Sequence, residues 1–250
     1  MNSQASKPNI TVFFPVYNDE RTVEKITLKT IAVLEKCANN YEIIIINDCS
    51  PDNSGKIADD LALRNNKIKV IHHQKNLGYG AALKSGFNSS QFEFICFTDG
   101  DDEYEINDIE KFIKLKDYYD LIITFRYIKL YSTWRIFVSK IYNALLRFIF
   151  KHKFRDISTG LRFVRKDIIA DLNLVSDSPF IGAELAIKTM LKGYRVGEVG
   201  IQTFPREFGS GSSTSIKNIL KTIKDIRLIY DQIFSSDYDL PVNRTRNKQE

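Results

Sequence analysis

The feature that most constrains the fold of this chain is the segment Tyr41–Ile46, which ends in four consecutive isoleucines. Asn39 and Asn40 precede the segment, and the turn-forming pair Asn47 and Asp48 follows it. A short run of successive apolar residues bounded in this way is typical of a strand that is buried on both faces. Such strands belong to parallel sheets that carry helices on both sides, so the segment favours an α/β fold.

Strand and helix patterns alternate through the first half of the chain. We expect further strands at Ile10–Phe14, Lys69–His73 and Phe92–Thr98, with helices at Arg21–Cys37, Gly55–Arg64 and Gly80–Ser89. Repeated strand–helix–strand units are joined by right-handed crossovers and build an open, mostly parallel, Rossmann-like sheet flanked by helices. In such sheets, ligands bind beyond the carboxyl ends of the strands. In the second half we expect a helix at Gly182–Lys192, a strand at Arg195–Phe204 and a helix at Ile216–Phe234.

The composition is that of one globular domain. Hydrophobic residues make up 43% of the 250 residues, which is enough apolar material for a core. The net charge of +5 is too small to indicate a dedicated nucleic-acid binder. We expect an N-terminal tail at 1–8, one folded domain at 9–235 and a disordered tail at 236–250.

The cysteines and the apolar runs bear on the compartment. Cys37, Cys49 and Cys96 are odd in number and lack paired metal spacing, which favours a reducing compartment. The first residues contain no apolar signal segment, and no run approaches the roughly 20 apolar residues of a membrane span. We therefore expect a cytoplasmic protein whose contact with a membrane is peripheral.

Four acidic side chains follow the strand expected at Phe92–Thr98, namely Asp99, Asp101, Asp102 and Glu103. Two like charges about 4 Å apart repel by about 1 kcal/mol in water and by about 4 kcal/mol at an effective dielectric constant near 20. A cluster of four carboxylates is therefore costly unless a cation neutralises it. Carboxylate oxygens on a glycine-containing turn suit the hard ions Mg²⁺ and Mn²⁺. The alternative is a solvated acidic turn without metal.

A second phosphate-binding pattern competes with the metal site. Gly78-Tyr79-Gly80 follows a strand, and Asp99 lies 21 residues after Gly78, as in a dinucleotide fingerprint with its ribose-binding acid. Leu83 occupies the third glycine position, and two strand–helix units precede the pattern, whereas the fingerprint usually opens the fold. An NAD-dependent dehydrogenase is therefore a distant alternative, which predicts NAD(H) binding without metal.

The segment from Arg135 to Arg155 is both basic and apolar. It holds six Lys or Arg residues and no acid among many large apolar side chains. A basic amphipathic helix of this kind lies in the interface of a bilayer, where each basic residue adds about 1 kcal/mol near an anionic surface. The alternatives are a core helix with a charged edge and a contact with a membrane-spanning partner subunit. We expect the charge-balanced helix at Ile216–Phe234 to pack on the domain, and His72 and His73 to be structural.

A series of motifs runs in order from the first strand to the last helix. They are Pro15-Val16-Tyr17-Asn18-Asp19, Asn47-Asp48-Cys49-Ser50-Pro51-Asp52, Asn76-Leu77-Gly78-Tyr79-Gly80, Asp99-Gly100-Asp101, Arg155-Asp156-Ile157-Ser158-Thr159-Gly160-Leu161-Arg162 and Arg206-Glu207-Phe208-Gly209. In order and spacing, the first four resemble the family-2 glycosyltransferases of the GT-A fold. The last two resemble one branch of that family, the polyprenyl-phosphate sugar transferases typified by dolichol-phosphate mannose synthase.

The resemblance implies a nucleotide-sugar donor site. In the family, residues at the positions of Pro15 and Tyr17 flank the base, and the residue at the position of Asp48 hydrogen-bonds it. Asp19 occupies a position of the same site where the family usually has Glu, which leaves Asp19 and Glu20 as candidates for one role. The resemblance leaves open whether the base is guanine or uracil and which sugar it carries.

The resemblance also implies a divalent metal cofactor, Mg²⁺ or Mn²⁺. Asp99 and Asp101 would hold the metal and the diphosphate. Glu103 falls where the branch usually has a metal-binding Gln and is the third candidate ligand. In the implied reaction the metal acts as a Lewis acid on the departing diphosphate, and the sugar is transferred with inversion. The domain at 9–235 would then be the catalytic domain.

Three arginines are candidates for phosphate contacts, because a guanidinium fork matches phosphate geometry. Arg126 and Arg206 align with positively charged positions of the family and are candidate catalytic residues beside Asp101. Arg162, together with Thr159, is a candidate for contact with the acceptor phosphate. The alternative for each arginine is an ion pair, and Arg162 could instead brace the turn in which it lies.

The acceptor decides whether a general base is needed. A lipid phosphate has a second pKa of about 6 and is already an anionic nucleophile at neutral pH, whereas a sugar hydroxyl needs a carboxylate within reach. Glu184 lies near the position of the base in hydroxyl-using relatives, or it is a helix N-terminal carboxylate favoured by the helix dipole. We expect transfer to polyprenyl phosphate at the membrane surface. The alternatives are a glycosyltransferase acting on a hydroxyl, the dehydrogenase and a catalytically silent binding subunit.

Overall fold

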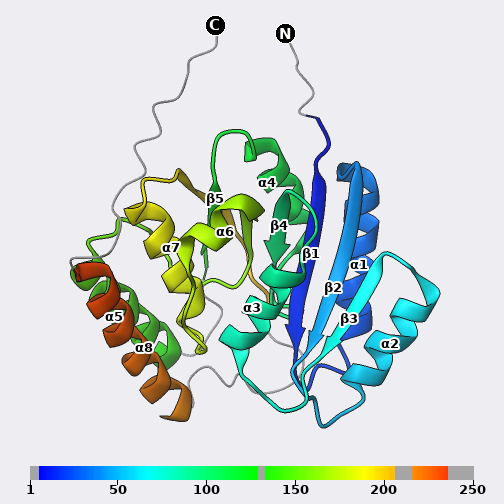
Figure 1. Cartoon of the computed structure of the whole chain (residues 1–250), viewed down its shortest axis with the longest axis horizontal. Coiled ribbons are helices and arrows are strands. Elements are labelled where there is room, and N and C mark those ends of the chain that lie inside the picture. The colour runs from blue at the N-terminus through cyan, green and yellow to red at the C-terminus, as the bar shows by residue number, and fades with distance from the viewer. Residues whose placement is uncertain (1–5, 129–132, 206–215, 236–250) are drawn as a thin grey trace, which may run out of the picture.

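The computed structural model describes residues 6–128, 133–205 and 216–235, which build a seven-stranded sheet with helices on both sides (Figure 1). The strands are β1 (Asn9–Val16), β2 (Asn40–Asn47), β3 (Ile68–His72), β4 (Phe94–Phe97), β5 (Leu121–Arg126), β6 (Arg162–Arg165) and β7 (Val196–Ile201). The helices are α1 (Val23–Cys37), α2 (Ser54–Arg64), α3 (Tyr79–Ser89), α4 (Ile109–Leu115), α5 (Thr133–Phe150), α6 (Lys166–Leu172), α7 (Ile181–Leu191) and α8 (Ile216–Phe234). Most of the expected tail at 1–8 and all of 236–250 lie outside the described residues.

The sheet confirms the predicted α/β class. Its strand order is β3-β2-β1-β4-β6-β5-β7. β1 pairs in parallel with β2 and with β4, and β2 pairs in parallel with β3. The exception is β6, which runs antiparallel between β4 and β5. The sequence motifs did not indicate β5 and β6 as strands.

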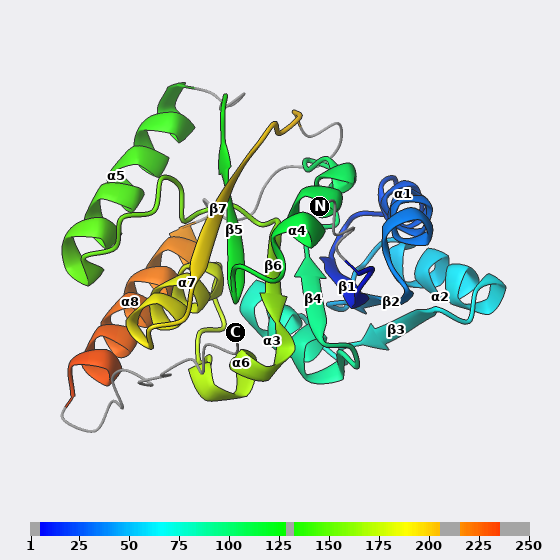
Figure 2. The same cartoon turned by 90° about the horizontal axis from the view of Figure 1, so that it is seen from above.

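The four isoleucines of β2 divide between two hydrophobic cores, one on each face of the sheet. Ile43 and Ile45 pack in the core formed with α1, α2 and α4, whereas Ile44 and Ile46 pack in the core formed with α3 and α5 to α8. All four side chains are fully buried. Figure 2 shows the same division, with α1 and α2 on one side of β1 to β3 and α3 on the other. A strand buried on both faces explains the run of successive apolar residues.

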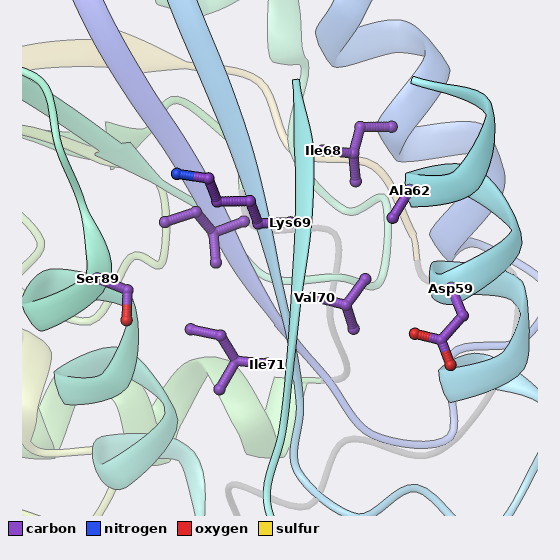
Figure 3. Close-up of a pocket in the computed structure, with 8 residues that line it drawn as sticks. Asp59, Ala62, Ile68, Lys69, Val70, Ile71 and Ser89 are labelled. Atoms are coloured by element: carbon purple, nitrogen blue, oxygen red, sulfur yellow. The ribbon is translucent and has the colours of Figure 1, made fainter. Parts of the chain in front are cut away.

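The sheet ends at β3 on one side, where a groove of about 520 Å³ borders the edge strand (Figure 3). Its lining comes from β3 itself, from Ile44 of β2, from Asp59 and Ala62 of α2 and from Ser89 of α3. None of the residues in the sequence motifs lines this groove, so the site that the motifs predict lies elsewhere.

The opposite side of the sheet carries α5 and α8 (Figures 1 and 2). The basic segment expected to be one helix up to Arg155 is helical only to Phe150, because Lys151 adopts a left-handed conformation with φ of 55° and ends α5. The predicted helix at Ile216–Phe234 is confirmed with the same bounds. Among the described residues, no helix is long and apolar enough to cross a membrane.

Candidate active site

The first four sequence motifs meet at the carboxyl ends of β1, β2 and β4. β1 lies between the other two strands, with Val16 opposite Asn47 of β2 and Phe13 opposite Phe97 of β4. The loops that follow these three parallel strands therefore start at one edge of the sheet. This edge is where parallel α/β sheets bind their ligands.

The loop after β1 is fixed by hydrogen bonds to Asp19. The Asp19 carboxylate accepts from the backbone N–H of Tyr17 at 2.9 Å, and its own N–H donates to the Ser54 hydroxyl at 3.0 Å. A Cβ on Gly100 would lie 2.7 Å from the Pro15 carbonyl oxygen and 3.3 Å from the Asp19 carboxylate. The absence of a side chain at Gly100 thus lets the acidic loop after β4 pack directly on the loop after β1.

Glu20 has a different environment from Asp19. Its carboxylate accepts from the backbone N–H of Asn53 at 3.1 Å and from the Asn53 side-chain amide at 3.0 Å. Asn53 is the residue before α2, so Glu20 fastens the start of that helix. Of the two candidates for one role in the donor site, Asp19 is the one that lies against the acidic loop.

The Asp48 carboxylate is buried and holds the loop after β3. One oxygen accepts from the backbone N–H of Leu77 and the other from that of Gly78, both at 2.8 Å. The His73 Nδ1 atom lies 2.7 Å from the first oxygen, and its Nε2 atom lies 2.9 Å from the Ser85 hydroxyl. His73 is thus structural, as expected, and Asp48 shapes the segment that begins α3. Contact between Asp48 and a nucleotide base stays a prediction.

The Asp99 carboxylate lies between the hydroxyl of Tyr79 and the backbone of Gly160. The Tyr79 hydroxyl donates to Asp99 Oδ1 at 2.7 Å. A Cβ on Gly160 would collide with the Asp99 carboxylate in its present orientation, so the glycine lets the turn after α5 approach this carboxylate closely. Burial, and then the charge of Asp99, raise the pKa of the Tyr79 hydroxyl well above its usual value, so that it stays a neutral donor.

The other acidic residues of the cluster differ in their surroundings. The Asp101 and Glu103 side chains are buried, each residue being 6% exposed, and the Glu103 N–H donates to Asp101 Oδ1 at 3.2 Å. Asp102 turns away through a left-handed backbone conformation and pairs with Lys25 at 2.8 Å and Lys29 at 2.9 Å on α1. The cluster of four expected from the sequence is therefore partly neutralised by the protein itself.

The donor set fits a divalent ion only in part. Among the described residues, no group of three or more His, Cys, Asp or Glu side chains is arranged to hold a metal, so Glu103 is not brought in as a third ligand. Two carboxylates nevertheless suffice for Mg²⁺, which is often bound by one or two carboxylates together with substrate phosphates and water. Asp99 and Asp101 remain the candidates for a site of this kind, and an all-protein metal cage is not present in the described part of the chain.

The turn after α5 is built around Asp156. Arg126, at the end of β5, donates to Asp156 at 2.8 and 2.9 Å and to the Ser158 hydroxyl at 2.8 Å. Thr159 is buried, and its hydroxyl donates to the Thr124 carbonyl oxygen at 2.8 Å. Arg126 is thus held in an ion pair, which is the alternative that the sequence left open. The Thr159 hydroxyl is bound to the backbone of β5 and does not face solvent.

Arg162 braces the same turn from inside the protein. Its side chain is 1% exposed and donates to the backbone carbonyl oxygens of Thr159 at 3.1 Å, of Ile157 at 2.6 Å and of Gly182. Three of its five N–H donors are taken by carbonyl groups, and the buried guanidinium does not reach the surface where a phosphate would bind. The expectation that Arg162 contacts the acceptor phosphate is therefore not supported, and the bracing role is.

Glu184 is fully buried on α7 and lies in an ion pair with Lys188 at 2.6 Å. Its carboxylate also accepts from the backbone N–H groups of Val175 and Ser176, each at 2.9 Å. Burial lowers the pKa of the Lys188 ammonium, and the Glu184 charge acts in the opposite direction. These contacts give Glu184 a structural role at the start of α7. Because its carboxylate is fully buried, it has no access to an acceptor as a general base.

Two contributions to the site were not recognised in the sequence. Tyr79 stood inside the Gly78-Tyr79-Gly80 motif, whose glycines alone drew attention. Tyr104 follows the acidic cluster directly, and its hydroxyl accepts from the Gly160 N–H at 2.7 Å. The position of Tyr104 directly after the acidic motif was an available signal, whereas nothing local linked Tyr79 to Asp99, 20 residues away. Arg206 and the rest of its motif, up to Gly209, lie outside the described residues.

The dinucleotide interpretation fails at the start of α3. A Cβ on Gly80 would lie 2.5 Å from the backbone of Asp177, and the Gly80 N–H donates to the Asp177 carbonyl oxygen at 3.2 Å. The first turn of α3 is therefore covered by the chain before α7. A pyrophosphate has no approach to the N–H groups that the fingerprint would offer.

The whole arrangement can be compared with known proteins. A model of the family described as glycosyl transferase family 2 matches residues 11–172. The chain belongs to this family. Membership excludes the NAD-dependent dehydrogenase. The matched residues include the acidic motif after β4, as the sequence resemblance implied.

Two curated relatives of this family 2 member carry related names. The undecaprenyl-phosphate 4-deoxy-4-formamido-L-arabinose transferase of Proteus mirabilis is 27% identical over 213 residues, covering 84% of this chain and 64% of that protein. The dolichyl-phosphate beta-glucosyltransferase of Trichomonas vaginalis is 32% identical over 109 residues, covering 42% of this chain and 32% of that protein. The chain thus spans less than two thirds of the length of these relatives. Both names belong to the polyprenyl-phosphate branch that the second-half motifs resemble.

A solved structure has the same fold. The glucosyl-3-phosphoglycerate synthase from Mycobacterium tuberculosis, in complex with Mn²⁺, uridine diphosphate and phosphoglyceric acid, superposes with a TM-score of 0.62. It is 14% identical and covers 90% of this chain and 76% of that chain. At this identity the likeness establishes the fold, which is the GT-A fold expected from the motifs.

Proposed function

We propose that the protein transfers a sugar, with inversion, from a nucleotide-diphosphate sugar to the phosphate of a polyprenyl phosphate at a membrane surface. One contact carries the proposal. Gly160, in the turn that resembles the polyprenyl-phosphate branch, packs against the carboxylate of Asp99, the first residue of the acidic motif. The donor motif and the branch-specific motif therefore lie next to each other, which supports transfer between their two proposed ligands.

The donor would bind across the ends of β1, β2 and β4. Pro15 and the exposed ring of Tyr17 would flank the base, and Asp19 would line the same loop. Asp99 and Asp101 would hold a divalent ion, Mg²⁺ or Mn²⁺, together with the diphosphate oxygens. Such an ion supplies Lewis-acid stabilisation of the leaving diphosphate. The related synthase, whose structure contains Mn²⁺ and uridine diphosphate, supports this assignment.

The acceptor would be a phosphate and not a hydroxyl. A lipid phosphate arrives ionised, so that positioning and charge stabilisation suffice for catalysis. Glu184, the one candidate base for a hydroxyl, is buried in its ion pair with Lys188, which disfavours the hydroxyl-directed alternative. We retain Arg206 as the proposed phosphate contact, since Arg162 is engaged by backbone carbonyl groups and Arg126 by Asp156. The names of the two relatives support a lipid-borne acceptor.

The membrane contact would be peripheral and would involve the basic segment from Arg135 to Arg155. That segment contains no acid, and its helix α5 leads into the turn that reaches Asp99. An anionic surface would attract such a helix and bring the active site toward the lipid phosphate. The comparisons give no support to a separate membrane-spanning partner subunit, which we leave out of the proposal.

The test is transfer of radiolabelled sugar from UDP- and GDP-sugars to a short-chain polyprenyl phosphate, with Mn²⁺, with Mg²⁺ and in EDTA. We first screen donors by thermal shift, since a donor at 100 times its dissociation constant adds about 2.7 kcal/mol to the free energy of unfolding. A donor that stabilises the protein in Mn²⁺ but not in EDTA, followed by labelled lipid, supports the proposal. Transfer to sugar hydroxyls alone, or donor binding that is equal in EDTA, contradicts it.

A further inference from the structure

Helix α5 exposes a continuous apolar stripe. Its large outward side chains recur at intervals of three and four residues, so that they share one face of the helix, and they are Trp134, Phe137, Ile141, Leu145 and Phe148. Trp134 and Phe148 are 70% and 74% exposed. The opposite face is held in the protein by Leu146 and Phe150, which are buried. The stripe is therefore not a core face, and α5 is more than a core helix with a charged edge.

Helix α8 carries a second apolar stripe beside its buried one. Ile226, Ile229 and Ile233 are buried against the domain, as expected for a helix that packs there. A neighbouring stripe is exposed, and it consists of Ile219, Ile223, Tyr230 and Phe234. The expectation that α8 only packs on the domain is thus incomplete, because these four large apolar side chains remain exposed.

The two stripes join in a groove between the helices. The groove has a volume of about 480 Å³ and is lined by Leu145 and Ile149 of α5 together with side chains of α8 that include Ile223 and Tyr230. The rings of Phe150 and Tyr230 lie 6.5 Å apart and tie the helices together below it. We call the two stripes and this groove the α5–α8 face. Exposed apolar side chains that gather in one face mark an interaction site, whereas single exposed ones are ordinary.

The charges around the α5–α8 face identify its partner. Lys140 and Arg147 are exposed on α5, and the sequence from Tyr127 to Arg155 contains no acid. On α8, Arg227 and Asp231 also line the groove and pair with each other at 3.8 Å, so that they add no net charge to the face. A second copy of the chain would bring up a face with the same net positive charge, which is unfavourable in a desolvated interface. An anionic bilayer offers both the apolar interior and the opposite charge.

We infer that the α5–α8 face inserts into the interface of an anionic phospholipid bilayer, with α8 contributing to binding as much as α5. The inference rests on the proposed function, because a lipid-borne acceptor requires the site to reach a membrane. Asn143 of α5 accepts from the Ile157 N–H at 2.9 Å and thereby connects the face to the turn that packs on Asp99. Insertion therefore sets the orientation of the active site toward the bilayer.

The protein contains its own probe for this insertion. Trp134 is the one tryptophan of the chain and lies on the exposed stripe of α5. We expect its fluorescence to shift to shorter wavelength with vesicles of phosphatidylglycerol and phosphatidylcholine, and brominated lipid to quench it. Vesicles of phosphatidylcholine alone should produce a much weaker change, and added salt should reverse part of it, because the cations of α5 are screened.

A matched pair of double variants tests the part of α8. Ile219→Ser with Ile223→Ser removes two exposed side chains from the α5–α8 face, and Leu63→Ser with Leu228→Ser removes two that are exposed elsewhere on α2 and α8. Both variants should fold, since none of the four side chains is buried. We expect the first to weaken vesicle binding about tenfold and the second to leave it unchanged. Equal binding by both variants and the wild type would overturn the inference.

Two further measurements separate the possible failures. The Ile219→Ser, Ile223→Ser variant should retain sugar transfer to a short-chain, water-soluble acceptor, because neither side chain belongs to the active site. Vesicle binding without any transfer by the wild type would refute the proposed function and spare the bilayer-binding face. Sugar transfer without vesicle binding would overturn the bilayer-binding face and leave the proposed function standing. A concentration-dependent dimer that this variant abolishes would assign the face to a second copy and overturn the inference.

Discussion

Replacing Tyr79 by Phe removes one hydroxyl from the neighbourhood of the acidic motif and leaves the ring in place. The hydroxyl donates to Asp99 Oδ1 at 2.7 Å, and its raised pKa keeps it protonated at all working pH values. Asp99 is a proposed metal ligand, so the bond holds the carboxylate in one orientation. Outer-shell partners of this kind orient the ligand that they touch.

The size of the effect follows from the type of bond. A hydrogen bond to a charged acceptor contributes about 1.5–3 kcal/mol to stability, and loss of an outer-shell partner typically lowers metal affinity about 10- to 100-fold. We therefore expect Tyr79→Phe to unfold at lower urea concentration than the wild type. We also expect it to bind Mn²⁺ in the presence of the nucleoside diphosphate about 10- to 100-fold more weakly.

A control with the same chemistry exists elsewhere in the protein. The Tyr194 hydroxyl donates to Asp171 Oδ2, also at 2.7 Å, and joins α6 to the segment before β7. Tyr194→Phe should therefore cost similar stability and leave Mn²⁺ binding unchanged. Titration calorimetry and the electron paramagnetic resonance signal of Mn²⁺ measure affinity, and urea unfolding measures stability. Wild-type Mn²⁺ affinity in Tyr79→Phe would refute the assignment of Tyr79 to the metal site.

Three other outcomes are expected. Asp101→Asn should keep the fold but abolish metal-dependent diphosphate binding, since an amide ligates a hard cation less well than a carboxylate; calorimetry showing equal binding in Mn²⁺ and EDTA would refute the role. Glu184→Gln should destabilise the protein by about 3–5 kcal/mol in urea unfolding, because it leaves the buried Lys188 ammonium without its charge partner, and the folded fraction should lose little transfer activity. A loss of more than about a hundredfold in activity would instead restore the general base. Burial lowers the pKa of His152 to about 4, so the unfolded chain binds a proton that the folded protein does not between about pH 6.5 and 4. Stability should therefore fall as the pH decreases from 7 to 5, by about 2 kcal/mol from this group, and a His152→Gln variant that keeps the whole loss would contradict it.

Patterns that are local in the chain predicted local structure well. The bounds expected for the helix at Ile216–Phe234 agree with those of α8, and the segment Tyr41–Ile46 lies within β2. Hydrophobic periodicity carries this information, since the side chains of a helix or strand alternate with a fixed period. Parallel pairing then brought the first four motifs to one edge, because the carboxyl ends of neighbouring parallel strands lie together.

Contacts between distant segments were not predictable in the same way. β6 has only four residues and runs antiparallel between β4 and β5, and the motif residue Arg162 begins it. In the sequence this arginine resembled a phosphate contact. In the structure its guanidinium is buried, because pairing of β6 with β4 and β5 turns the side chain toward the carbonyl groups of Thr159 and Gly182.

The sequence by itself determined the α/β class, the family and the carboxylates from which a metal site can be built. Only the tertiary structure decided what each charged group does. Asp102 pairs with α1, whereas Asp99 meets Tyr79 and Gly160, although the two aspartates stand three positions apart. Glu184 is withdrawn into an ion pair with Lys188. The physical reason is that the role of a charge depends on its burial and on the donors around it, and these are supplied by residues far away in the chain.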